Sequence, residues 1–180
     1  PDTDLNSIMI GNSNYNDDMW DLRPFITAKS TKESRKYIRF EYITDADIQE
    51  TVKQYAYYKL GKTKPQTVQN YINGSLPMFI EYCSLNGIHS FADVTLEDYL
   101  NFNLWMKNDK KVAVSTGNSS CHVVEEIIRI GQIKGWGVPT FHLPKTDTAN
   151  QLWNTKKSRK ANKTKPIPED VFDKILYHAV

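Results

Sequence analysis

Residues 65–87 read PQTVQNYINGSLPMFIEYCSLNG. Apolar side chains recur through this stretch at the spacing of one helix face, which predicts an amphipathic helix. These side chains are Val68, Ile72, Leu76, Phe79 and Cys83. Gly74 and Pro77 interrupt the pattern. Because proline lacks a backbone donor and clashes with the preceding turn, we expect a kink or break between Tyr71 and Pro77, before Asn86-Gly87 ends the helix.

A second helix is expected on the N-terminal side, from Thr44 to about Leu60. Thr44 and Asp47 have the spacing of a capping box, and Gly61 is a typical helix end. Its expected buried stripe consists of Ile48, Val52, Tyr55 and Ala56.

Two more helices are expected on the C-terminal side. The first follows a cap at Thr95 and runs to about Lys107, with Leu96, Leu100 and Leu104 facing inward. The second runs from about Ser115 or Thr116 to Lys134. Its expected inner stripe consists of Val124, Ile127, Ile128 and Gly131.

The sequence therefore predicts an all-α fold: a four-helix bundle with an irregular or extended N-terminal segment, a C-terminal tether and one further helix. Residues 1–19 are rich in Asn, Asp and Ser and are expected to be a loosely held leader. Residues 36–43 alternate in polarity like a short extended segment. We expect these units: a leader and extended segment over 1–43, a helical domain over 44–140, a basic linker over 141–166 and the first helix of a truncated domain over 167–180.

Composition excludes several classes of protein. The chain has 180 residues, of which 39% are hydrophobic, enough for a folded core. It contains no apolar run of 18 residues, so we expect no membrane span. Cys83 and Cys121, with no export signal among the first twenty residues, suggest reduced thiols in a cytoplasmic protein. Cys121-His122 lacks a second ligand pair, so no zinc site is expected.

Enzymatic motifs are also missing. The sequence has no phosphate-binding glycine loop, nucleophile elbow or zinc-protease motif. The four histidines are scattered and are expected to be surface or capping residues. We therefore expect no active site, no cofactor and no small-molecule substrate for these residues.

Charge is distributed unevenly. Residues 110–165 contain eleven bases and three acids, and the basic tether, KKSRKANKTK at 156–165, contains six bases and no acid. Such a run is either a solvated linker or a tail that binds a partner, and lysine or arginine that neutralises phosphate gives salt-sensitive binding to nucleic acid. The polar faces of the expected helices over 65–85 and about 115–134 are consistent with the same partner, because amides can bond base edges. Arg129 could instead pair with Glu125 or Glu126. The candidate DNA-binding residues are Lys62, Lys64, Gln66, Thr67, Gln69, Asn70, Asn73, Asn118, His122, Arg129, Lys156, Lys157, Arg159, Lys160, Lys163 and Lys165.

The order of these features resembles the N-terminal half of phage-type integrases, the tyrosine recombinases. The resemblance covers roughly residues 18–180. It starts with DDMWDL (17–22) and IRFEYITDADIQETVKQYAYYKL (38–60). The family's core-binding helix is matched by Thr67, Val68, Tyr71, Phe79 and Tyr82. The turn into a following helix is matched at Gly87-Ile88 and 95–100, and TKPIPEDVFDKIL (164–176) is similar to the start of the family's catalytic domain.

The resemblance implies a clamp that closes on double-stranded DNA, with other recombinase protomers as partners. The tether would cross the DNA backbone, and residues 20–42 would pack on the bundle or reach along the DNA. In the whole protein a tyrosine would cleave the strand and form a 3′-phosphotyrosyl link without metal or nucleotide. The family's catalytic set does not occur in these residues, so no catalytic residue is carried over. Gly74 and Pro77 depart from the family's uninterrupted helix.

Two other functions fit the residues. The chain could be a helical protein-interaction module whose last helix docks on a partner. It could also be a helix-turn-helix regulator, although no short helix pair with a tight glycine turn stands out.

Overall fold

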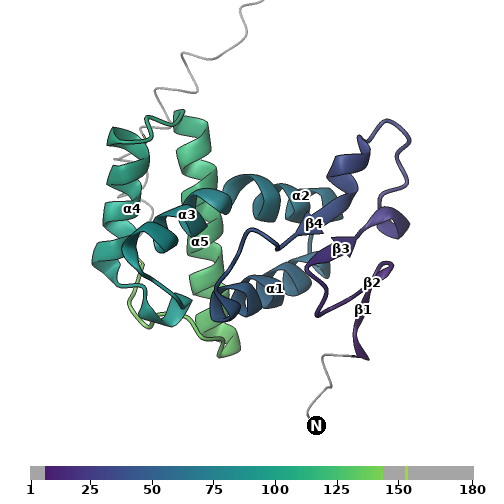
Figure 1. Cartoon of the computed structure of the whole chain (residues 1–180), viewed down its shortest axis with the longest axis horizontal. Coiled ribbons are helices and arrows are strands. Elements are labelled where there is room, and N and C mark those ends of the chain that lie inside the picture. Colours follow the sequence, from purple (N-terminus) through teal and green to yellow (C-terminus); the bar gives the residue numbers. More distant parts are fainter. Residues whose placement is uncertain (1–6, 144–152, 154–180) are drawn as a thin grey trace, which may run out of the picture.

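The computed structural model describes residues 7–143 and Trp153, and its fold is mostly helical (Figure 1). Five α-helices occur in this part of the chain. They are α1 (Ala46–Leu60), α2 (Pro65–Asn70), α3 (Pro77–Asn86), α4 (Leu96–Asn108) and α5 (Val114–Lys134). Because the expected helix over 65–85 is split in two, the predicted count of four is replaced by five.

The split in that helix is a π-helical turn over Tyr71–Ser75, labelled η4, between α2 and α3. Leu76 N–H donates to Tyr71 O at 2.9 Å, five residues back, and Pro77 then starts α3. The expected interruption between Tyr71 and Pro77 is confirmed. The five apolar residues that predicted the helix are all buried, so the chain keeps one inward face through the break.

Two small antiparallel strand pairs precede the helices. β1 (Met9–Ile10) pairs with β2 (Ser13–Asn14), and β3 (Met19–Asp21) pairs with β4 (Tyr37–Arg39), with Trp20 opposite Ile38. Two short 3-10 turns, η2 (Arg23–Phe25) and η3 (Glu33–Lys36), lie between β3 and β4. In Figure 1 these strands lie beside α1 and α2, at the end of the molecule away from α4.

The prediction of a loosely held leader is wrong for residues 7–19. Tyr15 and Trp20 are buried, and the Trp20 ring packs edge-on against Phe40 at 4.8 Å between centroids. The ammonium of Lys53 on α1 donates to Asn16 O at 2.9 Å. These aromatic rings belong to the same core as the helices, and residues 20–42 pack against the helices, which is one of the two arrangements expected for them.

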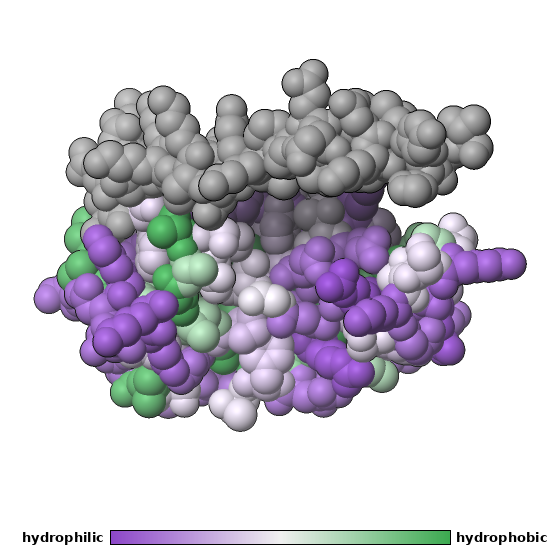
Figure 2. Space-filling view, turned by 90° about the horizontal axis from the view of Figure 1, so that it is seen from above, coloured by the Kyte–Doolittle hydropathy of each residue, from purple (hydrophilic) through white to green (hydrophobic). Residues whose placement is uncertain are grey.

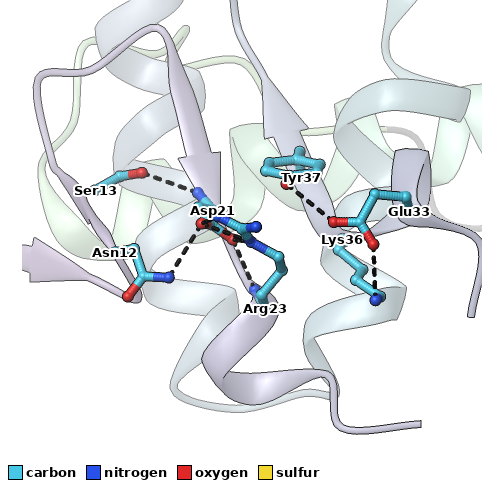
Figure 3. A network of polar contacts seen from close by, with 7 residues as sticks. All are labelled: Asn12, Ser13, Asp21, Arg23, Glu33, Lys36 and Tyr37. Carbon is cyan, nitrogen blue, oxygen red and sulfur yellow. Dashed lines mark hydrogen bonds and ion pairs between the residues drawn. The ribbon is translucent and has the colours of Figure 1, made fainter. Parts of the chain in front are cut away.

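Asp21 of β3 connects the two strand pairs through hydrogen bonds to Asn12 and Ser13 (Figure 3). Its carboxylate accepts from Asn12 Nδ2 at 3.1 Å and from the Arg23 guanidinium, with Nη2 at 2.6 Å. Its own N–H donates to Ser13 Oγ at 2.9 Å. Gly11, at φ +61°, leaves room for this approach, since a Cβ there would lie 2.0 Å from Asp21 O. Hydrogen bonds to Arg23 hold the pKa of Asp21 well below its usual range.

Two predicted details at helix starts have different outcomes. Thr95 caps α4 as expected, with Thr95 Oγ1 accepting from Asp98 N–H at 3.1 Å. The capping box at Thr44 and Asp47 is wrong, because Asp45 occupies the cap position without a side-chain bond to the helix. The Asp45 carboxylate instead lies 2.7 Å from His89 Nδ1.

The inward face of α4 is also different from the prediction. Leu96 and Leu104 are exposed, and Leu100 is only partly buried. The buried residues of α4 are Tyr99, Phe102, Asn103 and Met106. Phe102 packs against Phe79 and Tyr82 of α3, at 5.1 and 5.5 Å between ring centroids. The burial of this aromatic cluster, and not of the leucines, determines which face of α4 points inward.

The expected stripe of α5 is confirmed, with Val124, Ile127, Ile128 and Gly131 all buried. Gly131 leaves room for the side chain of Val138, which follows the helix in the chain, since a Cβ at Gly131 would lie 2.6 Å from that side chain. Gly135 ends the helix at φ +71°. Helix α5 thus packs against α1, η4, α3 and α4, and α1 and α2 run across it in Figure 1.

Candidate nucleic-acid interface

A polar groove lies between the π-helical turn and the start of α5. It has a volume of about 220 Å³ and is lined by Gly74, Ser75, Ser115, Thr116 and Ser119. The π turn brings Gly74 and Ser75 to the groove, and space around Gly74 is open because no atom lies within 4 Å of where a Cβ would be. Hydroxyl groups both donate and accept, so this lining can bond phosphate or base edges.

An ion-pair cluster joins α1 to α5. Glu126 on α5 accepts from Tyr55 Oη at 2.7 Å and from Lys59 Nζ at 3.1 Å. His122 Nε2 lies 3.7 Å from the same carboxylate. Burial would raise the pKa of Glu126, but the bonds from Tyr55 and Lys59 outweigh it and lower that pKa. Glu126 therefore keeps its negative charge at neutral pH, and the Lys59 ammonium offsets it.

Tyr71 links this cluster to the π turn. Its ring lies edge-on to His122 at 5.8 Å between centroids, and Lys59 Nζ lies 5.6 Å from the ring centroid. The phenol of Tyr55 is buried, and burial together with its bond to Glu126 raises its pKa. These contacts position His122, which is exposed, one turn along α5 from Ser119.

Of the ten candidate residues that the structure describes, nine are exposed or half-buried and one, Gln69, is buried. Five are exposed: Lys62, Lys64, Asn70, His122 and Arg129. Four are half-buried: Gln66, Thr67, Asn73 and Asn118. The six tether residues, Lys156, Lys157, Arg159, Lys160, Lys163 and Lys165, lie outside the described residues, as does the expected helix over 167–180.

The prediction that Gln69 and Asn73 lie on an open polar face is wrong. Gln69 is buried, with 6% of its surface exposed. Asn73 is bonded to strand β4: its Oδ1 accepts from Arg39 N–H at 3.0 Å and its Nδ2 donates to Tyr37 O at 2.9 Å. Asn73 lies within the π turn, which changes the helix period there, whereas Gln69 lies in α2, before the turn.

The alternative of a salt bridge for Arg129 is wrong. Tyr99 Oη donates to Glu125, and Glu126 is occupied by Tyr55 and Lys59. No ion pair reaches Arg129 among residues 7–143 and Trp153. Its exposed guanidinium is therefore available to an external anion.

Sequence reasoning missed the serine and threonine lining of the groove as a set. The signal was present in VSTGNSS, residues 114–120, where hydroxyl and small residues recur. It also missed Lys59, whose side chain is only 13% exposed because it pairs with Glu126. Contacts of this kind join residues far apart in sequence, so periodicity does not reveal them.

A second hollow has a different character. It has a volume of about 320 Å³ and is lined by Met9, Ile10, Phe25, Tyr57, Tyr58, Leu60 and Gly61. Met9 and Phe25 are more than half exposed.

In the view of Figure 2 most of the described surface is polar, with a narrower strip of apolar residues toward the side where α4 lies.

Comparisons with models of protein families, with curated proteins and with solved structures find no match. Within the described part of the chain, no three His, Cys, Asp or Glu side chains lie together in a way that could hold a metal ion. The same residues include no helix with the length and apolarity to cross a membrane.

Proposed function

We propose that this chain binds duplex DNA as the core-binding part of a site-specific tyrosine recombinase, with its helices forming the family's core-binding bundle. Other recombinase protomers on the same DNA would be its partners, in the cytoplasm. The proposal assigns no catalytic residue to this chain. Its role is to bind and position DNA.

The observation that carries the proposal is the polar groove together with exposed cations on and beside the elements that line it. Lys64 is the residue before α2, and Lys62 lies in the turn after α1. Arg129 lies on α5, two turns beyond His122. Duplex DNA carries one negative charge per about 1.7 Å of its axis, so exposed cations on α5 and just before α2 are suited to its backbone.

The groove residues would tune binding and the cations would supply most of the affinity. Phosphate contacts fix register and orientation, whereas contacts to base edges carry sequence information. Asn70, Asn118 and His122 carry amide or ring groups that can read a base edge, as can the hydroxyl groups of the groove.

The apolar hollow favours a second candidate, a helical protein-interaction module. Exposed Met and aromatic residues around a concave surface are typical of protein-binding sites. The hollow is formed by β1, η2 and the end of α1, and it does not include a candidate DNA-binding residue.

The two candidates are separated by binding of a labelled duplex, followed by fluorescence anisotropy at about 50 mM salt, where phosphate contacts are strong. Arg129→Ala and Lys62→Ala should each weaken binding several-fold, since each removes a phosphate contact. Lys107→Ala, an exposed lysine on α4, is the matched control for removal of one charge. Equal effects at Lys107 and Arg129 would mean that no particular face binds DNA, and no binding by the wild type would favour the interaction module.

A further inference from the structure

The chain between β3 and β4, residues 23–36, forms a basic loop. It contains five bases and one acid. It lies at the end of the molecule away from α4, and its turn η3 packs against α2 (Figure 1). None of its residues is among the candidates that the sequence singled out, so the loop carries positive charge with no role assigned to it.

Two bases of the basic loop bond within the protein and hold its two ends (Figure 3). The Arg23 guanidinium donates to the Asp21 carboxylate and lies 5.5 Å from the Tyr37 ring centroid. The carboxylate of Glu33, the one acid of the loop, accepts from Lys36 Nζ at 2.9 Å and from Tyr37 Oη at 3.1 Å. The acid is therefore engaged at the end of the loop and does not neutralise its remaining bases.

Three cations of the basic loop are left over. Lys29, Lys32 and Arg35 are exposed, and the ion pairs within the described part of the chain include none of them. They occur within seven residues of one another. Like charges this close repel, and an anion bound between them would relieve the repulsion.

A second basic segment lies beside the loop. Thr31 Oγ1 is 3.5 Å from Gln66 Nε2, although the two residues are 35 positions apart. Lys32 directly follows Thr31, and Lys64 precedes Gln66 by two residues. Lys64 is exposed, as is Lys62. The contact between η3 and α2 thus brings cations from two separate segments to one surface.

The strand after the loop is fixed to the π-helical turn that reaches the groove. Asn73 Oδ1 accepts from Arg39 N–H at 3.0 Å, and Asn73 Nδ2 donates to Tyr37 O at 2.9 Å. The same turn carries Gly74 and Ser75 of the groove. Loop and groove are therefore connected through η4, and the loop has a defined position on the helical body.

We propose that the basic loop is a second phosphate-binding element, in which Lys29, Lys32 and Arg35 contact the backbone of the duplex together with Lys62 and Lys64. The inference rests on the proposed function. Such contacts fix the orientation of the protein on DNA without reading its sequence. The guanidinium of Arg35 can also bond two phosphate oxygens at once.

Protection of lysines in the wild-type protein is the first test. Exposed lysines are acetylated with sulfo-N-hydroxysuccinimide acetate, with and without duplex, and each site is resolved by mass spectrometry. At a duplex concentration about ten times Kd, only about one molecule in eleven is free, so the rates at Lys29 and Lys32 should fall about 10-fold. Lys107, exposed on α4, should react at an unchanged rate.

Affinity of a double variant is the second test. Lys29→Ala with Lys32→Ala should make the slope of log affinity against log salt less steep by about 2, and weaken binding about 30-fold at about 0.15 M salt, at roughly 5-fold for each lost phosphate contact. Lys107→Ala with Lys134→Ala is the matched control. It removes two exposed lysines outside the basic surface and should weaken binding less than about 3-fold, since distant exposed charges are screened.

The outcomes separate the loop from the proposed function. Duplex binding that leaves Lys29 and Lys32 unprotected, with the two double variants alike, would overturn the role of the loop while the proposed function stands. A wild type that binds no duplex at low salt would overturn both. Protection of the same lysines by vesicles of phosphatidylcholine and phosphatidylserine, and not by duplex, would replace DNA by a membrane surface and overturn the inference.

Discussion

Lys59 and Glu126 lie 67 positions apart in the chain, and their side chains form an ion pair of 3.1 Å between Nζ and Oε1. The pair joins the end of α1 to the middle of α5, the helix whose first turns line the groove. Both side chains are largely buried, at 13% and 18% exposure. A buried charge without its partner is costly, so this ion pair couples stability of the fold to the shape of the candidate interface.

Glu126→Gln should lower the free energy of unfolding by about 1–3 kcal/mol at pH 7, because Lys59 is left without its partner. The bonds to Glu126 overcome burial and depress its pKa. The ionised Glu126 carboxylate therefore stabilises the fold at pH values above its unfolded pKa of about 4.3. This stabilisation is lost as the pH falls through the lower pKa that Glu126 has in the folded protein. Urea unfolding at pH 7 and at acid pH checks this. Glu41→Gln, in an exposed pair at 3.9 Å, is the control, and an equal effect of both variants would contradict the account.

Asp21→Asn should also destabilise the protein at pH 7, because it removes the charged bonds from Arg23. The pKa of Asp21 is depressed further than that of Glu126, chiefly by its hydrogen bonds to Arg23. The difference from wild type should consequently persist to more acid pH than for Glu126→Gln, and close only well below the unfolded pKa of about 3.9. Thermal unfolding over a pH series measures this. Asp93→Asn, at an exposed position, is the control and should not differ from the wild type in stability. The account is contradicted if the stability difference of Glu126→Gln persists to more acid pH than that of Asp21→Asn.

Asn73 and Asn70 lie three residues apart and have different expected roles. Asn73→Ala removes two bonds to strand β4 and should cost about 1–2 kcal/mol of stability. Asn70 is exposed, so Asn70→Ala should leave stability within about 0.5 kcal/mol and change DNA binding. Unfolding curves and a competition assay with duplexes of varied sequence compare the two. The assignment fails if Asn70→Ala unfolds the protein more easily than Asn73→Ala.

The break at Tyr71–Ser75 was predictable because Pro77 is a strong local signal whose effect does not depend on tertiary contacts. The stripes of α1 and α5 were predictable for a related reason, since each helix has one dominant apolar face. On α4 two faces compete, one of leucines and one of aromatic residues. Periodicity alone does not rank them, and packing on Phe79 and Tyr82 decides it.

The site was predictable only in part. Exposure of Lys62, Lys64 and Arg129 follows from residue type, as charged side chains stay in water. Burial of Gln69 depends on how α2 packs, and the bonds of Asn73 depend on the position of β4. Trp153 could not be assigned to the core from sequence, because its partners Asn103 and Gly117 come from two other helices.

The most direct test of the central claim, that the chain binds the DNA backbone through its helical face and tether, is a salt titration of duplex binding. The logarithm of affinity should fall linearly with the logarithm of salt concentration. In a variant with Lys156, Lys157, Arg159 and Lys160 changed to Ala, the slope should be less steep by about 3–4, at roughly 0.9 for each phosphate that is no longer neutralised. Binding that is insensitive to salt, or an identical slope in the variant, would contradict the account.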